Sequence, residues 1–152
     1  MHIQFTYFKP KCASDVIEKF KYKKVIVFIM PEYYTDKVSA KVRSSRQEKD
    51  KLASSSDKAV KSGRSVLITR AVATNLTGET QRILIGATKQ YANHFTDASF
   101  DTTKSFEGPI KANSACEATK FPLEEGEVVG AIFEGVTEGD ELLLTVVGEY
   151  IK

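Results

Sequence analysis

The chain has 152 residues, of which 41% are hydrophobic and 28% charged, with a formal net charge of +2; this suits one domain with a core and is too short for two domains of ordinary size. The composition excludes an intrinsically disordered chain. The longest apolar run, Val25 to Met30, is far shorter than the roughly 20 residues of a membrane-spanning helix, and the first nine residues lack the pattern of a secretion signal, so we expect no membrane partner.

The first thirty residues predict two strands and a short helix. Apolar residues alternate with others over 3–7, up to Pro10, which cannot donate a hydrogen bond to a β-ladder. Ser14-Asp15 precedes an apolar set that ends at Phe20, which is typical of a capped helix of one or two turns. The continuous run 24–30, closed by a proline, is typical of a strand buried on both faces.

A basic segment follows, and we expect a partly mobile insertion, a loop or arm, at about residues 31–63. Val38, Ala40 and Val42 alternate with polar residues, which favours an edge strand. Residues 44–61 are rich in Ser, Lys, Asp and Gln. This composition predicts a marginal helix over Gln47 to Leu52 within a loop, or an arm that orders on contact.

Short apolar runs separated by turn residues fill the second half of the chain. The run Ser65 to Thr74 stops at Asn75-Leu76-Thr77-Gly78-Glu79, and Gln81 to Ala87 returns as its partner, which predicts a hairpin. Residues 91–108 are polar with spaced aromatic residues, and we expect a long loop pinned to the core by these rings, with at most one short strand.

Three further strands are predicted at Ser114 to Phe121, Val128 to Phe133 and Leu142 to Ile151, and the last two flank a turn at Gly135 to Asp140 that closes a hairpin. Short strands at this spacing, bounded by Gly, Asn and Asp, indicate a mainly β fold. We therefore predict one antiparallel β-sandwich domain of jelly-roll type over residues 1–152, with at most one short helix.

The two signs of charge are segregated along the chain. Residues 1–64 contain 15 Lys and Arg against 7 Asp and Glu, whereas residues 65–152 contain 7 against 13. Between Phe121 and Ile151 there are eight acidic side chains and no Lys or Arg, a surface that would repel nucleic acid. The basic segment is therefore either a solvated loop or an arm that contacts an acidic partner, which could be nucleic acid or the acidic half of a neighbouring subunit.

A search for catalytic motifs gives nothing that predicts an enzyme. His94 is the one candidate general base in the long loop, with Asp97 and Asp101 nearby, and a polar loop histidine is more often a surface residue. Calcium could use Asp97, Asp101, Glu138 and Asp140, but no loop has the alternating acidic ladder of a calcium site. We expect no metal and no other cofactor.

Two cysteines and one glycosylation triplet have ordinary explanations. Cys12 and Cys116 lie in opposite halves and form no zinc-binding pair with a histidine, so we interpret them as idle thiols, although sequence leaves a bridge between them open. Asn75-Leu76-Thr77 matches the N-glycosylation triplet, which is common by chance.

Several motifs of the second half occur together in a pattern that covers roughly residues 64–151. They are Val66-Leu67-Ile68-Thr69-Arg70-Ala71-Val72-Ala73-Thr74-Asn75, the Thr-Gly turn, Ile83-Leu84-Ile85-Gly86, Leu123-Glu124-Glu125-Gly126-Glu127-Val128-Val129 and Glu138-Gly139-Asp140-Glu141-Leu142. In this pattern the chain resembles small β-sandwich virion proteins of tailed and icosahedral bacteriophages.

This resemblance implies a non-enzymatic structural or attachment role in a virion: a capsid decoration, vertex (penton) or spike-base protein, or a tail-tip component, made in the host cytoplasm. Its partners would be other copies of the chain or a major capsid or tail protein, and nucleic acid is not expected. The residues predicted to carry partner contacts are Lys37, Lys41, Arg43, Arg46, Lys49, Lys51, Glu138, Asp140 and Glu141.

The alternative function is a ligand-binding β-sandwich, with carbohydrate as the ligand. Sugar platforms need exposed aromatic rings, although the chain has no Trp. The candidates are Tyr33, Tyr34, Tyr91, Phe95, Phe100 and Phe106. Each of these rings could instead pin a loop to the core.

Overall fold

The computed structural model describes residues 3–4, 28–29, 31–43, 49–91 and 100–152. The chain divides into two compact units, residues 1–32 and 33–152. In the first unit, the two-residue strands β1 (Ile3–Gln4) and β2 (Phe28–Ile29) pair antiparallel. The helix predicted up to Phe20, and most of the two strands predicted on either side of it, lie outside the described residues.

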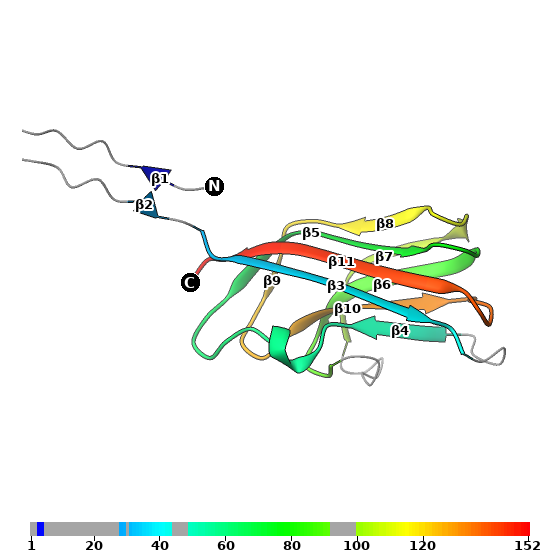
Figure 1. The fold of residues 1–152 in the computed structure, drawn as a ribbon, viewed down its shortest axis with the longest axis horizontal. Helices are drawn as coiled ribbons and strands as arrows, with labels where there is room; N and C mark the ends of the chain where they lie inside the picture. Colours follow the sequence, from blue (N-terminus) through cyan, green and yellow to red (C-terminus); the bar gives the residue numbers. More distant parts are fainter. Residues whose placement is uncertain (1–2, 5–27, 30, 44–48, 92–99) are drawn as a thin grey trace, which may run out of the picture. The chain divides into compact units, whose positions relative to one another are not determined.

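The second unit is a sandwich of two antiparallel sheets (Figure 1). The first sheet has the order β3-β11-β5-β8, with β9 also paired to β5, and the second has the order β4-β10-β6-β7. The strands are β3 (Tyr33–Lys41), β4 (Lys49–Ala53), β5 (Val66–Asn75), β6 (Thr80–Thr88), β7 (Phe100–Ile110), β8 (Ala115–Ala118), β9 (Phe121–Leu123), β10 (Val128–Glu134) and β11 (Glu141–Tyr150), and a 3-10 turn lies at Ser56–Lys58.

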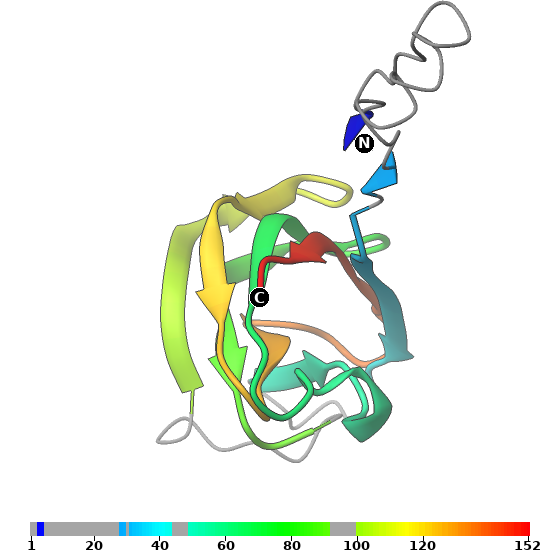
Figure 2. The same cartoon turned by 90° about the vertical axis from the view of Figure 1, so that its left-hand side faces the viewer.

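The strand order is that of a jelly roll. Apart from β6 to β7 and β8 to β9, each pair of consecutive strands in the second unit is divided between the two sheets. If β8 and β9 are taken as one interrupted strand, each sheet has four strands, as in an eight-stranded jelly roll. Figure 2 shows the sheets enclosing the core, with β3 beside β4 at one side and β7 beside β8 at the other. The predicted antiparallel β-sandwich of jelly-roll type is confirmed.

Both predicted hairpins of the second half are wrong. β5 and β6 have the predicted positions, but β5 belongs to the first sheet and β6 to the second. β10 and β11 are separated in the same way. The turn residues reverse the chain as expected, yet the reversal leads across the sandwich, because both strands of each pair bury an apolar face against the same core.

The basic segment is not an insertion. Residues 33–41 and 49–53 form β3 and β4, which are the end strands of the two sheets, and the helix predicted over 47–52 is excluded for residues 49–52. Exposed and charged residues such as Lys49 conceal β4 in the sequence, although lysine is a common residue on edge strands. The edge strand predicted from Val38, Ala40 and Val42 is confirmed as β3.

The long loop predicted over 91–108 is wrong for residues 100–108, which belong to β7. This strand pairs with β6 along its length, with irregular register near Gly86. All its residues between Phe100 and Ile110 are exposed, so the alternation that reveals a half-buried strand is missing. The strand predicted at 114–121 is interrupted, because Lys120 has a φ of 57° and separates β8 from β9.

The core lies between the two sheets and contains one continuous set of apolar side chains. Alternate residues of β5 and β11 fill it from the first sheet, and alternate residues of β6 and β10 fill it from the second. Its largest fully buried side chains are Phe133, Ile68, Ile83, Ile85, Leu123, Leu142 and Leu144. A smaller cluster on the outer face of the second sheet contains Ala53, Val128 and Ile132.

A buried polar cluster joins the β5–β6 and β10–β11 connections at one end of the sandwich. Asn75 ends β5, and its Nδ2 donates to Asp140 Oδ2 at 2.9 Å and to Thr80 Oγ1 at 3.1 Å. Asp140 Oδ2 also accepts from the Thr137 N–H at 2.9 Å. Asn75 and Thr80 are 1% exposed and Asp140 is 8% exposed. We call Asn75, Thr80 and Asp140 the cross-sheet cluster, since it connects the turn after β5 to the turn before β11.

The backbone around the cross-sheet cluster leaves no spare room. A Cβ added at Gly78 would lie 2.3 Å from Asp140 Oδ1. The Val42 N–H donates to the Asp140 carbonyl at 2.9 Å, and the Leu76 N–H donates to the Glu141 carbonyl at 2.7 Å. Through its side chain and its main chain, Asp140 therefore links the turn before β11 to the ends of β3 and β5.

We expect Asp140→Ala to lower the free energy of unfolding by about 1–3 kcal/mol, because it leaves the buried amide of Asn75 without its charged acceptor. Urea unfolding followed by circular dichroism measures the change. The control is Glu138→Ala, an exposed carboxylate two residues away, which should change stability by less than about 0.5 kcal/mol. Equal stability of the two variants would contradict a structural role for the cluster.

Candidate partner-binding side

The two end strands β3 and β4 place basic residues from both sheets on one side of the sandwich. Lys37 and Lys41 lie on β3, Lys49 and Lys51 lie on β4, and Arg43 follows β3. We call these five residues the basic side. Arg46, predicted with them, lies outside the described residues. The topology thus places the basic residues of one sequence stretch on neighbouring edges of the two sheets.

The outer face of β3 carries Lys37, Ser39 and Lys41, all of them exposed. β3 pairs with β11 so that Lys37 lies opposite Thr145, Ser39 opposite Leu143 and Lys41 opposite Glu141. Among the described residues, neither Lys37 nor Lys41 makes an ion pair within 4 Å. Both ammonium groups are therefore available for a partner.

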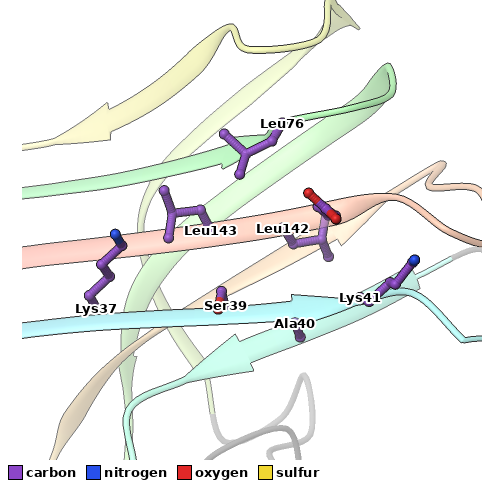
Figure 3. A pocket seen from close by; sticks show the side chains of 8 residues that line it. Lys37, Ser39, Ala40, Lys41, Leu76, Leu142 and Leu143 are labelled. Carbon is purple, nitrogen blue, oxygen red and sulfur yellow. The ribbon is translucent and has the colours of Figure 1, made fainter.

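A shallow groove of about 420 Å³ crosses the outer face beside these lysines. Figure 3 shows Lys37, Leu76 and Leu143 directed to the same side of the sheet, whereas Leu142 is directed to the other. The small side chain of Ser39 leaves space between the two lysines. The groove therefore combines an apolar floor with a basic rim on β3.

The residues of the predicted acidic turn lie partly at the surface and partly in the interior. Glu141 is exposed and lines the groove, directly opposite Lys41 in the strand register. Glu138 is exposed in the turn before β11. Asp140 is buried in the cross-sheet cluster, where its carboxylate accepts hydrogen bonds. Contacts of these three residues with a partner stay predictions.

Lys49 is already paired within the fold. Its Nζ lies 3.5 Å from Glu134 Oε1, and the other carboxylate oxygen lies 3.5 Å from Arg82 Nη1. Arg82 Nε in turn lies 3.4 Å from Glu107 Oε1. These residues are register neighbours across β4, β10, β6 and β7. The resulting row of alternating charges neutralises one end of the second sheet, so Lys49 is less available for binding than Lys37.

Each basic edge has an aspartate directly before a lysine. The Lys37 N–H donates to Asp36 Oδ1 at 2.9 Å, and the Lys51 N–H donates to Asp50 Oδ1 at 2.8 Å. A carboxylate that satisfies an edge amide weakens the template that an end strand offers to any passing strand. Both edges thus discourage indiscriminate pairing.

The aromatic residues form no shared platform in the described part of the chain. Tyr34 is buried, its hydroxyl donates to the Lys58 carbonyl at 2.6 Å, and its ring packs edge-on against Tyr150, so its prediction as a sugar-stacking ring is wrong. Tyr33 and Phe106 are exposed, but they lie on different sheets. The other predicted rings are Tyr91 and Phe100, which are half-buried, and Phe95, which lies outside the described residues.

The remaining candidates from the sequence give no site. His94, Asp97 and Cys12 lie outside the described residues. Cys116 is buried, and burial raises the pKa of its thiol, an effect that Lys104 opposes. Among the described residues, no three His, Cys, Asp or Glu side chains group closely enough to hold a metal ion. The glycosylation triplet is also unavailable to an enzyme in the folded chain, because the Asn75 amide is buried.

In the part of the chain that the structure describes, no helix is long and apolar enough to cross a membrane.

The groove residues Leu76, Ser39 and Leu143 were missed by sequence reasoning. The edge strand predicted from Val38, Ala40 and Val42 places Ser39 between Lys37 and Lys41 on one face, but it does not show which residues of other strands lie beside Ser39. Leu143 lies on β11, and Leu76 directly follows β5, which is adjacent to β11 in space but far from it in sequence. Only the β11–β5 and β11–β3 registers bring them beside Ser39.

No protein-family model matches the sequence, and comparison with curated proteins finds no match. Among solved structures, the chain is similar to the K3 cleaved adhesin domain of Lys-gingipain from Porphyromonas gingivalis, with 15% identity and a TM-score of 0.37 over 75% of this chain and 71% of that one. The K2 cleaved adhesin domain of Lys-gingipain is 12% identical to the chain, with a TM-score of 0.36 over 80% of this chain and 89% of that one. The Drosophila NLP core is 12% identical to the chain, with a TM-score of 0.34 over 78% of this chain and 98% of that one. These likenesses carry no argument about partners, and the β-sandwich assignment rests on the strand pairing itself.

We expect Tyr34→Phe to flatten the loss of stability at alkaline pH. Burial, assisted by the nearby Asp36 carboxylate, raises the pKa of Tyr34 well above its ordinary value of about 10. A raised pKa in the fold means that this contribution to stability is complete below about pH 10 and is lost as the pH rises further. At neutral pH the variant should lose about 1 kcal/mol with its hydrogen bond to Lys58.

Urea unfolding of both proteins between pH 7 and about pH 11 measures this difference. Lysine titration affects both proteins equally, so the difference between them isolates Tyr34. The control is Tyr33→Phe, which alters an exposed ring and should match the unmodified chain. Parallel pH profiles for the unmodified chain and Tyr34→Phe would contradict the assignment.

Proposed function

We propose that this chain is a non-enzymatic structural protein that binds its partners through protein–protein contacts in a larger assembly. Capsid decoration, vertex or tail attachment in a virus particle is the setting in which we place it, with the chain made in the host cytoplasm. The observation that carries the proposal is the basic side, where the jelly roll sets the lysine-bearing end strands of both sheets next to each other.

An acidic protein surface fits the basic side better than nucleic acid does. Asp36 and Asp50 lie among its lysines, and Glu141 lies opposite Lys41. Nucleic-acid grooves combine a continuous cationic track with aromatic rings on which bases stack. Interleaved charges of both signs instead give orientation and specificity at protein interfaces. The partner can be another copy of this chain or a different shell or tail protein.

A carbohydrate-binding module is the other candidate function for a jelly roll. A sugar platform would use exposed rings that lie close together. Tyr33 and Phe106 are the exposed aromatic residues of the described part, and different sheets carry them. No observation on the described residues therefore favours this function over assembly.

We expect light scattering to give a particle mass above the 16.9 kDa of one chain at 0.1 M salt or below, and a smaller mass at 1 M salt. The physical reason is that the screening length falls from about 10 Å to about 3 Å over this range, which weakens contacts between oppositely charged surfaces. Protein concentration is varied at each salt, because association follows mass action.

A parallel experiment captures partners on the immobilised chain from particles or lysates of its native source, with elution by salt. The control is the same chain with Lys37, Lys41 and Lys51 changed to Gln. A mass of 16.9 kDa at every salt and concentration, together with no salt-eluted partner that distinguishes the two columns, would contradict the proposed function.

A further inference from the structure

In the end strand β3, the residues whose main-chain groups face the open edge are also those whose side chains lie on the outer face. β3 pairs only with β11 among the described strands. The Val42 N–H donates toward the β11 side, to the Asp140 carbonyl. Because main-chain groups alternate in direction along an antiparallel strand, the odd-numbered residues 35–41 direct theirs to the open edge. The same residues carry their side chains on the outer face, beside the groove. Among them, the Lys37 N–H donates to Asp36 Oδ1, so the Asp36 side chain must move before this N–H can donate to a partner strand.

β3 is a poor match for a second copy of itself. Lys37 and Lys41 lie on one face, so an antiparallel β3 partner would bring lysines opposite or diagonal to one another, which is destabilising. Asp36 is half-buried on the other face near the edge, where a facing Asp36 would add a second repulsion. The pattern of charge on β3 selects against self-pairing and for an acidic strand.

The opposite edge of the second sheet is less suited to strand addition. β7 has irregular register near Gly86, Lys104 lies opposite the core residue Ile85, and Pro109 lacks an N–H. Bulges, inward charges and prolines are the devices that protect an end strand from pairing. β7 is therefore less suited to strand addition than β3, which has a regular ladder with β11 and a groove beside its outer face.

From these observations we propose that the open edge of β3 binds an extended segment of a partner protein by strand addition. The segment has acidic side chains opposite Lys37 and Lys41 and an apolar side chain between them, opposite Ser39. Residues four apart in a strand are separated by about 13 Å and lie on one face. The ligand is therefore an acidic-x-apolar-x-acidic sequence in an extended conformation. Main-chain hydrogen bonds supply affinity and the alternate side chains supply specificity.

The groove explains the apolar position. Leu143 lies opposite Ser39 in the β3–β11 register, and Leu76 borders the same hollow. A branched apolar side chain of the segment would lean over the small Ser39 toward Leu143, which lies on the next strand of the sheet, and Leu76 would extend the apolar floor beyond it. Their partial burial shows that each keeps apolar surface for such a contact. A polar side chain at this position of the segment would lose hydrogen bonds to water, and Leu143 offers no polar group to replace them.

The two lysines are not equivalent. Lys41 lies opposite Glu141, whose carboxylate offsets part of its charge, whereas Lys37 lies opposite the uncharged Thr145. The acidic side chain that faces Lys37 therefore contributes more to binding. A charge-reversing substitution should therefore weaken binding more at Lys37 than at Lys41.

This inference rests on the proposed function and names the kind of partner that the basic side takes. The test uses the full chain and the synthetic peptide acetyl-TETVTET-amide, with binding followed by NMR titration or calorimetry. We expect Lys37→Glu to weaken binding by about tenfold and Lys41→Glu by less. Lys111→Glu, which makes the same charge change in an exposed turn beyond β7, should leave binding within about twofold.

Two altered peptides test the strand geometry. A peptide with N-methyl groups on the alternate amides that face β3 should lose binding, because it keeps every charge but cannot complete the ladder. The charge-reversed peptide acetyl-TKTVTKT-amide should bind less tightly than the acidic one to the unmodified chain, and more tightly to the variant Lys37→Glu.

Equal weakening by Lys37→Glu and Lys111→Glu, or full binding of the N-methylated peptide, would overturn the inference. So would a lack of any binding by acetyl-TETVTET-amide at millimolar concentration. The proposed function is tested separately, because salt-sensitive assembly or partner capture can occur through other faces. Assembly without peptide binding would therefore reject strand addition at β3 and leave the proposed function standing.

Discussion

The contact between Asn75 and Asp140 supports the whole arrangement of strands. Asn75 ends a strand of the first sheet, and Asp140 lies in the turn that returns the chain to that sheet. Their hydrogen bond closes the end of the sandwich around buried polar groups that would otherwise lack partners. With both turns fixed, β5 and β11 become neighbours, and β3 is set at the edge beside β11. The candidate site depends on this register, because it puts Leu143 opposite Ser39.

The same edge strands must resist random pairing and still bind a partner. Natural end strands use charge to avoid unspecific association, and β3 and β4 follow this rule with lysines outside and an aspartate on the edge amide. A charged edge is also selective, because a strand of complementary charge removes the repulsion that excludes others. Protection and recognition are thus two consequences of one pattern of side chains.

The sequence predicted the positions of several strands well and their pairing poorly. The apolar runs at β5, β6, β10 and β11 each follow from residues that are buried in the core. The alternation of Val38, Ala40 and Val42 predicts an edge strand at β3, whereas the sequence predicts a marginal helix within a loop or arm at β4 and a loop at β7, because these two exposed strands lack an apolar alternation. Turn residues such as Gly139, with a φ of 93°, indicate a reversal of the chain. They do not indicate whether the chain returns to the same sheet.

By itself, then, the sequence determined a β-sandwich fold, the segregation of charge and the residues of the basic side. These properties follow from local composition and period, which short-range physics controls. The tertiary structure alone decided which strands share a sheet, that Asp140 is buried and that Tyr34 faces the core. It also decided that Ser39, Leu76 and Leu143 meet in one groove. Such contacts join residues far apart in the chain, and their positions are set by packing two sheets around one core.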